Sequence, residues 1–236
     1  MNGFENEKQI IETINSIAFK NLSSDLKNVL KKINNGTIPR TLSAEKHGGT
    51  DKADLSITID SNVYFISVKK GTGNSVHQEP IEDFINFLRI NFEDDNSVFN
   101  DLRHFIWGDG TFNGSGKIGN RISASKYKKE YPEKVSNIQS YFNRHKKELL
   151  QRFLITGAVS NKKADYLFYG NINDCTVVSD DDILDFAYNI EKRPISIGVL
   201  TFQAWNRNIN GGIKSEHKRG QIQLKWGGLK ADIKSI

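Results

Sequence analysis

Residues 54–60, Asp54-Leu-Ser-Ile-Thr-Ile-Asp60, are followed by Ser61-Asn62 and then by Val63-Tyr-Phe-Ile-Ser-Val-Lys69. Apolar, β-branched and aromatic residues alternate with polar ones, which is typical of two short strands joined by a tight turn. With Ser61-Asn62 as a two-residue loop, Asp60 pairs with Val63, and Asp54 then lies directly opposite Lys69. We therefore expect the acid and the lysine to meet on one face of a hairpin, either as an ordinary cross-strand ion pair or as part of a site.

The composition is that of a globular protein. The chain has 236 residues, of which 37% are hydrophobic, and 14 Phe, 7 Tyr and 3 Trp provide bulky core material. A single cysteine, Cys175, excludes an intrachain disulfide and suits a reducing compartment. The sequence has no secretory signal and no apolar run of the roughly 20 residues that span a bilayer. We therefore expect a cytoplasmic protein with no membrane contact.

Positive charge is concentrated in two segments. Ten Lys/Arg stand against three Glu between Lys117 and Arg152, and nine against three acids between Glu191 and Ile236, although the whole chain carries only +5. The remainder is therefore net acidic. Solvated helix faces would explain one such segment, but two of them favour a polyanionic partner.

Helical periodicity covers residues 7–33, with a break near 21–24, as well as residues 81–88, 98–106 and 133–154. A further helix is expected at 181–190, and strands at 164–169, 174–178, 195–202 and 221–226. Helices and strands are mixed without strict alternation. The sequence therefore predicts an α/β (α+β) fold, with a central mixed sheet flanked by helices in one domain over residues 1–236.

A second carboxylate follows the hairpin at the start of the next predicted helix. Of Glu79, Glu82 and Asp83, only Glu82 is both helical and adjacent to the apolar stripe that begins at Ile81. Glu79 falls before the helix, with Pro80 at its beginning, and Asp83 points away. Glu82 is therefore the best second acid, with Glu79 and Asp83 as alternatives.

Asp54, then Ser67-Val68-Lys69, then Glu82 resembles the PD-(D/E)XK nuclease superfamily. The usual second acid would stand at Ser67, and the signature proline at Ala53. The chain is similar to the variant of type II restriction endonucleases in which that acid moves to the following helix, S-x-K-(x)12–13-E, because twelve residues separate Lys69 from Glu82. The motif covers residues 54–82 only, within a predicted catalytic core at about 40–110.

The resemblance implies a restriction-endonuclease-like core and a role for each motif residue. Asp54, Glu82 and the backbone carbonyl of Val68 would bind Mg²⁺, for which Mn²⁺ would substitute. Lys69 would orient or deprotonate the attacking water. Ser67 would bond a metal-bound water or fill the vacated acid position, and Glu45 or acids of the first helix are possible outer ligands.

The two basic segments, at about 117–152 and 191–236, supply candidates for DNA contact. Arg, Asn and Gln read base edges, whereas Lys suits phosphate. The candidates are Gln203, Asn206, Arg207, Asn208, Lys214, Lys218, Arg219, Lys126 and Lys128.

The sequence thus predicts a Mg²⁺-dependent type II restriction endonuclease that cuts double-stranded DNA at a short specific site. We expect a homodimer or higher homo-oligomer, because one active site cuts one strand. A companion DNA methyltransferase would protect the same site without binding this chain. The alternatives are a repair or junction-resolving nuclease of the same superfamily, or a non-catalytic DNA-binding protein.

Overall fold

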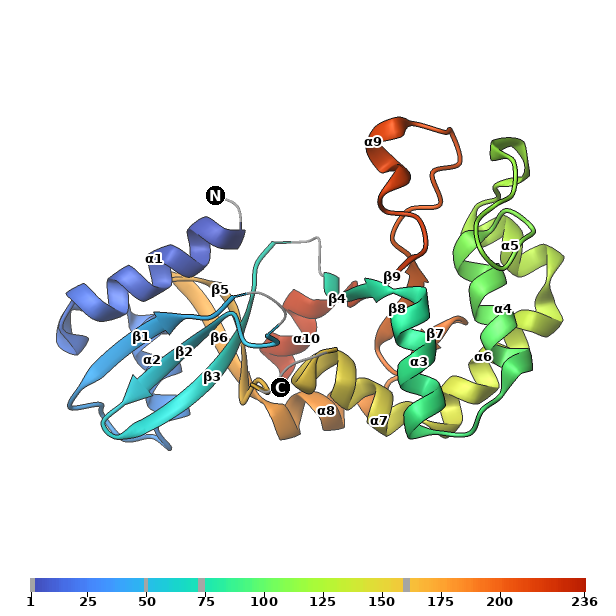
Figure 1. Ribbon diagram of the computed structural model, residues 1–236. Coiled ribbons are helices and arrows are strands. Elements are labelled where there is room, and N and C mark those ends of the chain that lie inside the picture. The colour runs from blue at the N-terminus through green and yellow to red at the C-terminus, as the bar shows by residue number, and fades with distance from the viewer. Residues whose placement is uncertain (1–2, 49–50, 72–74, 159–161) are drawn as a thin grey trace. The chain divides into compact units, whose positions relative to one another are not determined.

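The computed structural model describes residues 3–48, 51–71, 75–158 and 162–236 (Figure 1). The chain divides into two compact units. The first unit comprises residues 1–74, 150–187 and 227–236, and the second comprises 75–149 and 188–226. Each unit has a sheet of its own. The chain passes from one unit to the other within the helices α7 (Lys146–Gln151) and α8 (Asp180–Asn189), and near residues 74 and 227.

The first unit is built on a five-stranded mixed sheet in the order β1-β2-β3-β5-β6. Its strands are β1 (Leu42–Lys46), β2 (Leu55–Ile59), β3 (Asn62–Lys69), β5 (Tyr166–Asn171) and β6 (Asp174–Ser179). The central strands β3 and β5 are parallel, and the other neighbours are antiparallel. This mixed sheet confirms the predicted fold class.

Helices cover this sheet, and the first two of them lie where the apolar pattern predicts helices. The helix α1 (Gly3–Ser16) packs against β1, while α2 (Ser24–Ile33) and α10 (Leu229–Ser235) pack against β6. The predicted break between the first two helices is confirmed, since Ser23 caps α2 by accepting a hydrogen bond from the Leu26 amide. Ile57, Leu55 and Ile66 are fully buried in the resulting core.

The second unit contains an antiparallel sheet in the order β4-β9-β8-β7. Its strands are β4 (Ser75–Pro80), β7 (Ser196–Ile197), β8 (Leu200–Ala204) and β9 (Gln221–Lys225). Its helices are α3 (Ile81–Asn91), α4 (Asn96–Trp107), α5 (Ala124–Glu130), α6 (Pro132–Arg144) and α9 (Ile213–Glu216). The buried ring of Phe202 joins sheet to helices, with its centroid 5.6 Å from that of Phe84 and 5.0 Å from that of Phe142.

Most strands lie where the alternation predicts them, but two were not anticipated, and the single strand predicted at 195–202 is instead the antiparallel pair β7 and β8. The strands β1 and β4 fall in polar segments whose composition carries little strand signal. The predicted helix over 133–154 is interrupted at His145 and ends in a π-helical turn, Arg152–Thr156. No helix in the described part of the chain is both long and apolar enough to cross a membrane.

The hairpin register differs from the prediction by two residues. Ile59 pairs with Asn62, so the two-residue loop is Asp60-Ser61, and continuation of the ladder sets Asp54 against Ser67 instead of Lys69. The cause is Asp60, which adopts a left-handed backbone (φ 56°) while its carboxylate accepts hydrogen bonds from the Arg40 and Thr41 amides. A shift of two residues leaves every side chain on its predicted face.

Removal of the Phe202 ring should destabilise the second unit. Phe202→Ala is expected to lower the free energy of unfolding by about 3–5 kcal/mol, because the ring is fully buried among other aromatic rings. Denaturant unfolding of the variant measures the loss. The control is Ile90→Ala on the same unit, where the side chain is 71% exposed, and a similar loss in both variants would contradict the assignment of Phe202 to the core.

Candidate active site

Asp54 lies directly before β2 and is held by the neighbouring strand β3. Its backbone amide donates to the Ile66 carbonyl at 2.9 Å. Its carboxylate atom Oδ2 accepts hydrogen bonds from the Val68 amide (2.6 Å), the Ser67 hydroxyl (3.3 Å) and the Lys69 ammonium (3.4 Å). Within the described residues all hydrogen bonds to this carboxylate end on Oδ2, and none ends on Oδ1.

Lys69 contacts two oxygen atoms of this site. Besides the Asp54 carboxylate, its Nζ donates to the Val68 carbonyl at 3.0 Å. The side chains of Lys69 and Asp54 are 20% and 29% exposed, so both are partly shielded yet reachable from solvent. The predicted contact between Asp54 and Lys69 is therefore confirmed. The two residues are diagonal neighbours on the adjacent strands, because Ser67 and not Lys69 lies directly opposite Asp54.

The sheet makes this arrangement rigid. β3 is hydrogen-bonded to β2 on one side and to β5 on the other, with Ser67 beside Leu167 and Lys69 beside Tyr169. The Tyr169 hydroxyl donates to the Gly71 carbonyl at 2.8 Å, which fixes the chain directly after the strand. The residues that contact Asp54 thus come from a central strand, whose backbone has little freedom to move.

Two ionisable residues at this site, Lys52 and Glu7, are not among the individual residues that the sequence predicts for it. Lys52 is buried, donates to the Phe153 carbonyl, and has its pKa lowered to about 7 by burial and by the positive charge of Lys69. Glu7, on α1, is an acid of the first helix, and burial together with the charge of Asp54 raises its pKa. The alternation in residues 54–69 carries no signal for either group, because both come from outside the hairpin.

The oxygen atoms of the first unit fit a hard divalent cation. Asp54 Oδ1 and the Val68 carbonyl oxygen are a carboxylate and a carbonyl, which Mg²⁺ accepts while keeping several water ligands. Among the described residues, no three His, Cys, Asp or Glu side chains gather as a metal site. A cation here would therefore be held by few protein ligands and many waters.

Glu82 lies in the first turn of α3, in the second unit. Its carboxylate is 57% exposed and accepts hydrogen bonds from Arg103 Nε (2.8 Å) and Nη2 (2.6 Å), and Arg103 lowers the pKa of Glu82. Glu79 instead is buried in β4, 2.9 Å from His77 Nε2. Glu82 is thus the accessible acid of the two, and its part in metal binding stays a prediction.

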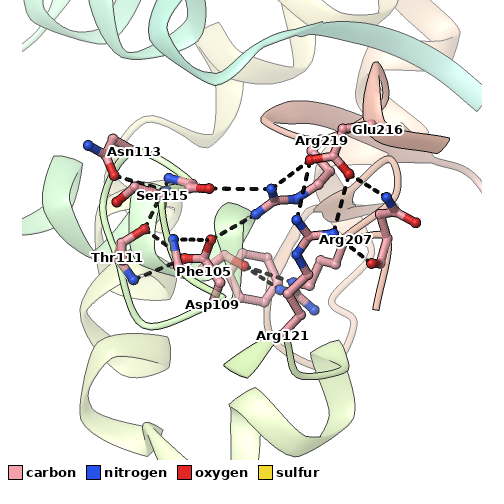
Figure 2. A network of polar contacts seen from close by, with 12 residues as sticks. Phe105, Asp109, Thr111, Asn113, Ser115, Arg121, Arg207, Glu216 and Arg219 are labelled. Carbon is pink, nitrogen blue, oxygen red and sulfur yellow. Dashed lines mark hydrogen bonds and ion pairs between the residues drawn. The ribbon is translucent and has the colours of Figure 1, made fainter. Parts of the chain in front are cut away.

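Several residues predicted to read DNA are engaged inside the second unit (Figure 2). Arg207 is buried, its guanidinium lies 4.6 Å from the Phe105 ring centre, and it donates to the Phe105 carbonyl. Arg219 donates to Asp109 at 2.8 Å. Asn208 is buried and donates to the Gly212 carbonyl at 3.0 Å. In this conformation these three side chains support the unit's own loops.

The remaining candidates differ in how accessible they are. Gln203 and Asn206 are partly buried, with Gln203 donating to Gln223 and Asn206 accepting from the Asn208 amide. Lys128 donates to the Pro194 carbonyl. Lys126 and Lys214 are exposed, whereas Lys218 is partly buried and lies over the Trp205 ring. The exposed lysines are the candidates that solvent, and hence phosphate, reaches most readily.

A buried lysine of lowered pKa makes stability depend on pH. Between about pH 7 and its ordinary pKa, Lys52 binds more protons in the unfolded chain than in the folded one, so the free energy of unfolding rises with pH in this window. Lys52→Met removes this dependence. The stability that Lys52→Met gains over the wild type is therefore expected to be about 3 kcal/mol larger at pH 6 than at pH 9.

Denaturant unfolding in EDTA at the two pH values measures this gain. Lys230→Met, on an exposed lysine of α10 in the same unit, serves as the control. Equal effects of Lys52→Met at pH 6 and pH 9 would show that Lys52 keeps its ordinary pKa.

No family model matches the chain, and no curated protein matches it significantly. Among solved structures it is similar to the crystal structure of restriction endonuclease MspI in complex with its cognate DNA, with a TM-score of 0.60 and 16% sequence identity. The alignment covers 93% of this chain and 87% of that one. At this identity the likeness concerns the fold, and this chain therefore has a restriction-endonuclease-like fold.

Proposed function

We propose that this chain is a type II restriction endonuclease, a Mg²⁺-dependent enzyme that hydrolyses phosphodiester bonds of double-stranded DNA at a short specific sequence. The observation that carries the proposal is the contact between Asp54 and Lys69, 3.4 Å apart on a mixed sheet of restriction-endonuclease-like fold. The solved structure to which the chain is similar is a restriction endonuclease with its cognate DNA, which supports DNA as the substrate.

Each residue of the site has a role in this proposal. Asp54, the Val68 carbonyl and Glu82 would hold Mg²⁺, with Mn²⁺ as a substitute. The bound ion would supply an activated water and stabilise the leaving 3′ oxygen. Lys69 Nζ would orient that water and offset the negative charge that develops on the phosphate. Ser67 would keep Asp54 in place through its hydrogen bond to Oδ2.

Double-strand cleavage requires two such sites. One site of this kind cuts one strand, so we propose that the chain acts as a homodimer or higher homo-oligomer. In the cell, a methyltransferase of the same specificity would protect the host's own DNA without binding this chain. Lys126, Lys128, Lys214 and Lys218 are proposed to contact phosphate, which positions the duplex without reading its sequence.

Loss of Lys69 should abolish cleavage and spare binding. Lys69→Ala is expected to lower the rate of plasmid digestion with Mg²⁺ by about 10³-fold or more, because the variant lacks the group that orients the water. Mapping the ends of the wild-type products gives the recognised sequence, and a gel-shift assay in Ca²⁺ measures binding. Lys230→Ala is the control for the loss of one positive charge in the same unit. Full activity of Lys69→Ala would overturn the proposed function.

The second carboxylate can be identified by substitution. Glu82→Gln should lower cleavage about 10²-fold or more, whereas Asp83→Asn, an exposed acid in the same helical turn, should have little effect. Glu7→Gln tests the acid of the first helix. If Glu7→Gln is inactive and Glu82→Gln active, the second ligand is Glu7, and the displaced-acid interpretation of residues 67–82 is wrong.

A further inference from the structure

Two loops of the second unit are fastened to each other. Residues 108–121 connect α4 to α5, and residues 206–220 connect β8 to β9 and include α9. They are far apart in sequence and extend from the same unit in Figure 1. We call residues 108–121 and 206–220 the paired loops.

Charged side chains cross-link the paired loops (Figure 2). The buried carboxylate of Asp109 accepts a hydrogen bond from Arg219 Nη2 at 2.8 Å, and Arg219 Nη1 donates to Glu216 at 2.9 Å. Arg121 donates to the same Glu216 carboxylate and, at 2.9 Å, to the Asn208 carbonyl. Asp109 also accepts hydrogen bonds from the Thr111 and Gly116 amides, so it holds its own loop in shape as well.

The indole ring of Trp107 joins the same two loops. A Cβ atom added to Gly114 would lie 2.3 Å from this ring and one added to Gly220 would lie 2.4 Å from it, so the backbone of each loop packs directly against the ring. The Arg219 guanidinium lies 5.2 Å from the ring centre. Polar and aromatic contacts therefore fix the paired loops as one body.

The outer surface of the paired loops differs from their interior. It exposes apolar, amide and ammonium groups, namely Phe112, Asn113, Lys117, Ile118, Ile213 and Lys214. Ile213 is 93% exposed, so its whole side chain is available for contact with another molecule. Glu216 is the only acid among residues 206–220, and its charge is offset by Arg121 and Arg219.

We propose that the paired loops bind duplex DNA as a single rigid element that reads base edges, and that Asp109 and Glu216 are positioning residues for this recognition. The proposal rests on the proposed function and extends it to a surface and to residues that do not touch the DNA. Lysines would contact phosphate, amides would bond base edges, and Ile213 and Phe112 would make apolar contacts such as those with the thymine methyl group.

The hydrogen bonds of Asp109 and Glu216 to arginine explain how two acidic residues are compatible with a surface that binds DNA. Arg219 and Asn208, with Arg121, lower the pKa of Glu216 to about 2, so this carboxylate is ionised whenever the protein is folded near neutral pH. An ionised Glu216 keeps both guanidinium groups oriented inside the unit. The positive charge that DNA meets is then carried by the exposed lysines, and the arginines set the spacing of the two loops.

Photo-cross-linking tests the surface without requiring cleavage. p-Benzoylphenylalanine is introduced in place of Ile213 or Phe112 and, as a control, in place of Ile90, which is 71% exposed on α3 of the same unit. The probe is a random-sequence pool of duplex DNA in Ca²⁺, with single-stranded DNA as competitor. We expect cross-links to duplex from positions 213 and 112 and few from position 90. Binding without cross-links at 213 and 112, or with equal cross-links at 90, would overturn the inference.

Sequence discrimination tests the positioning role. Glu216→Ala removes the shared partner of two arginines at a half-exposed position, and Glu133→Ala on α6 is the control. The readout is the ratio of cleavage at the mapped sequence to cleavage at duplexes with one changed base pair. Glu216→Ala is expected to lower this ratio about tenfold.

A ratio equal to that of the wild type would overturn the positioning role. The readout is a ratio, so a merely less stable protein would not change it. If the wild-type chain cuts no DNA but cross-links through positions 213 and 112, the proposed function fails while the paired loops remain a DNA-binding surface. If it cuts DNA and position 90 cross-links as well as 213, only this inference fails.

Discussion

The placement of β3 between β2 and β5 is the constraint on which the candidate site depends. The position of the Asp54 carboxylate is set by β3. The backbone amide of Val68 and the side chains of Ser67 and Lys69 all donate hydrogen bonds to it. A backbone amide is a donor that no side-chain motion removes, and β3 is paired along both edges. The acid is therefore oriented by the sheet.

The same constraint explains why a serine suits position 67. Ser67 is 1% exposed and lies against Asp54, so a second carboxylate at this position would stand beside the first in a poorly hydrated place. Lys52 is also buried nearby, so the net charge of the site depends on only a few ionisable groups. A short hydroxyl instead donates to Asp54 and adds no charge, which is consistent with an acid supplied from another element.

The sequence predicts the chemistry of the hairpin better than its register. Alternation of apolar and polar residues is a property of the strands themselves, and it identifies the faces of β2 and β3 correctly. The register depends on Asp60, whose side chain bonds amides of residues 40 and 41, twenty positions away, and no pattern within residues 54–69 reports that contact. Glu7 is one of the first-helix acids that the sequence names only as a group, and Lys52 lies two positions before Asp54. The alternation in residues 54–69 does not report the burial that shifts the pKa of either group.

Charge counting shows the same limit on a larger scale. Arg121, Arg207 and Arg219 all contribute to the positive segments of the sequence, yet all three are buried and bonded to acceptors within the second unit. A guanidinium has five donors in a fixed plane and suits such cross-links, whereas a lysine ammonium is a compact point charge on a flexible stem. The net charge of a segment therefore overstates the positive charge that an anionic partner can reach here. Arg121 and Arg219 instead connect the two paired loops to each other, and the net charge of the segments does not reveal this role.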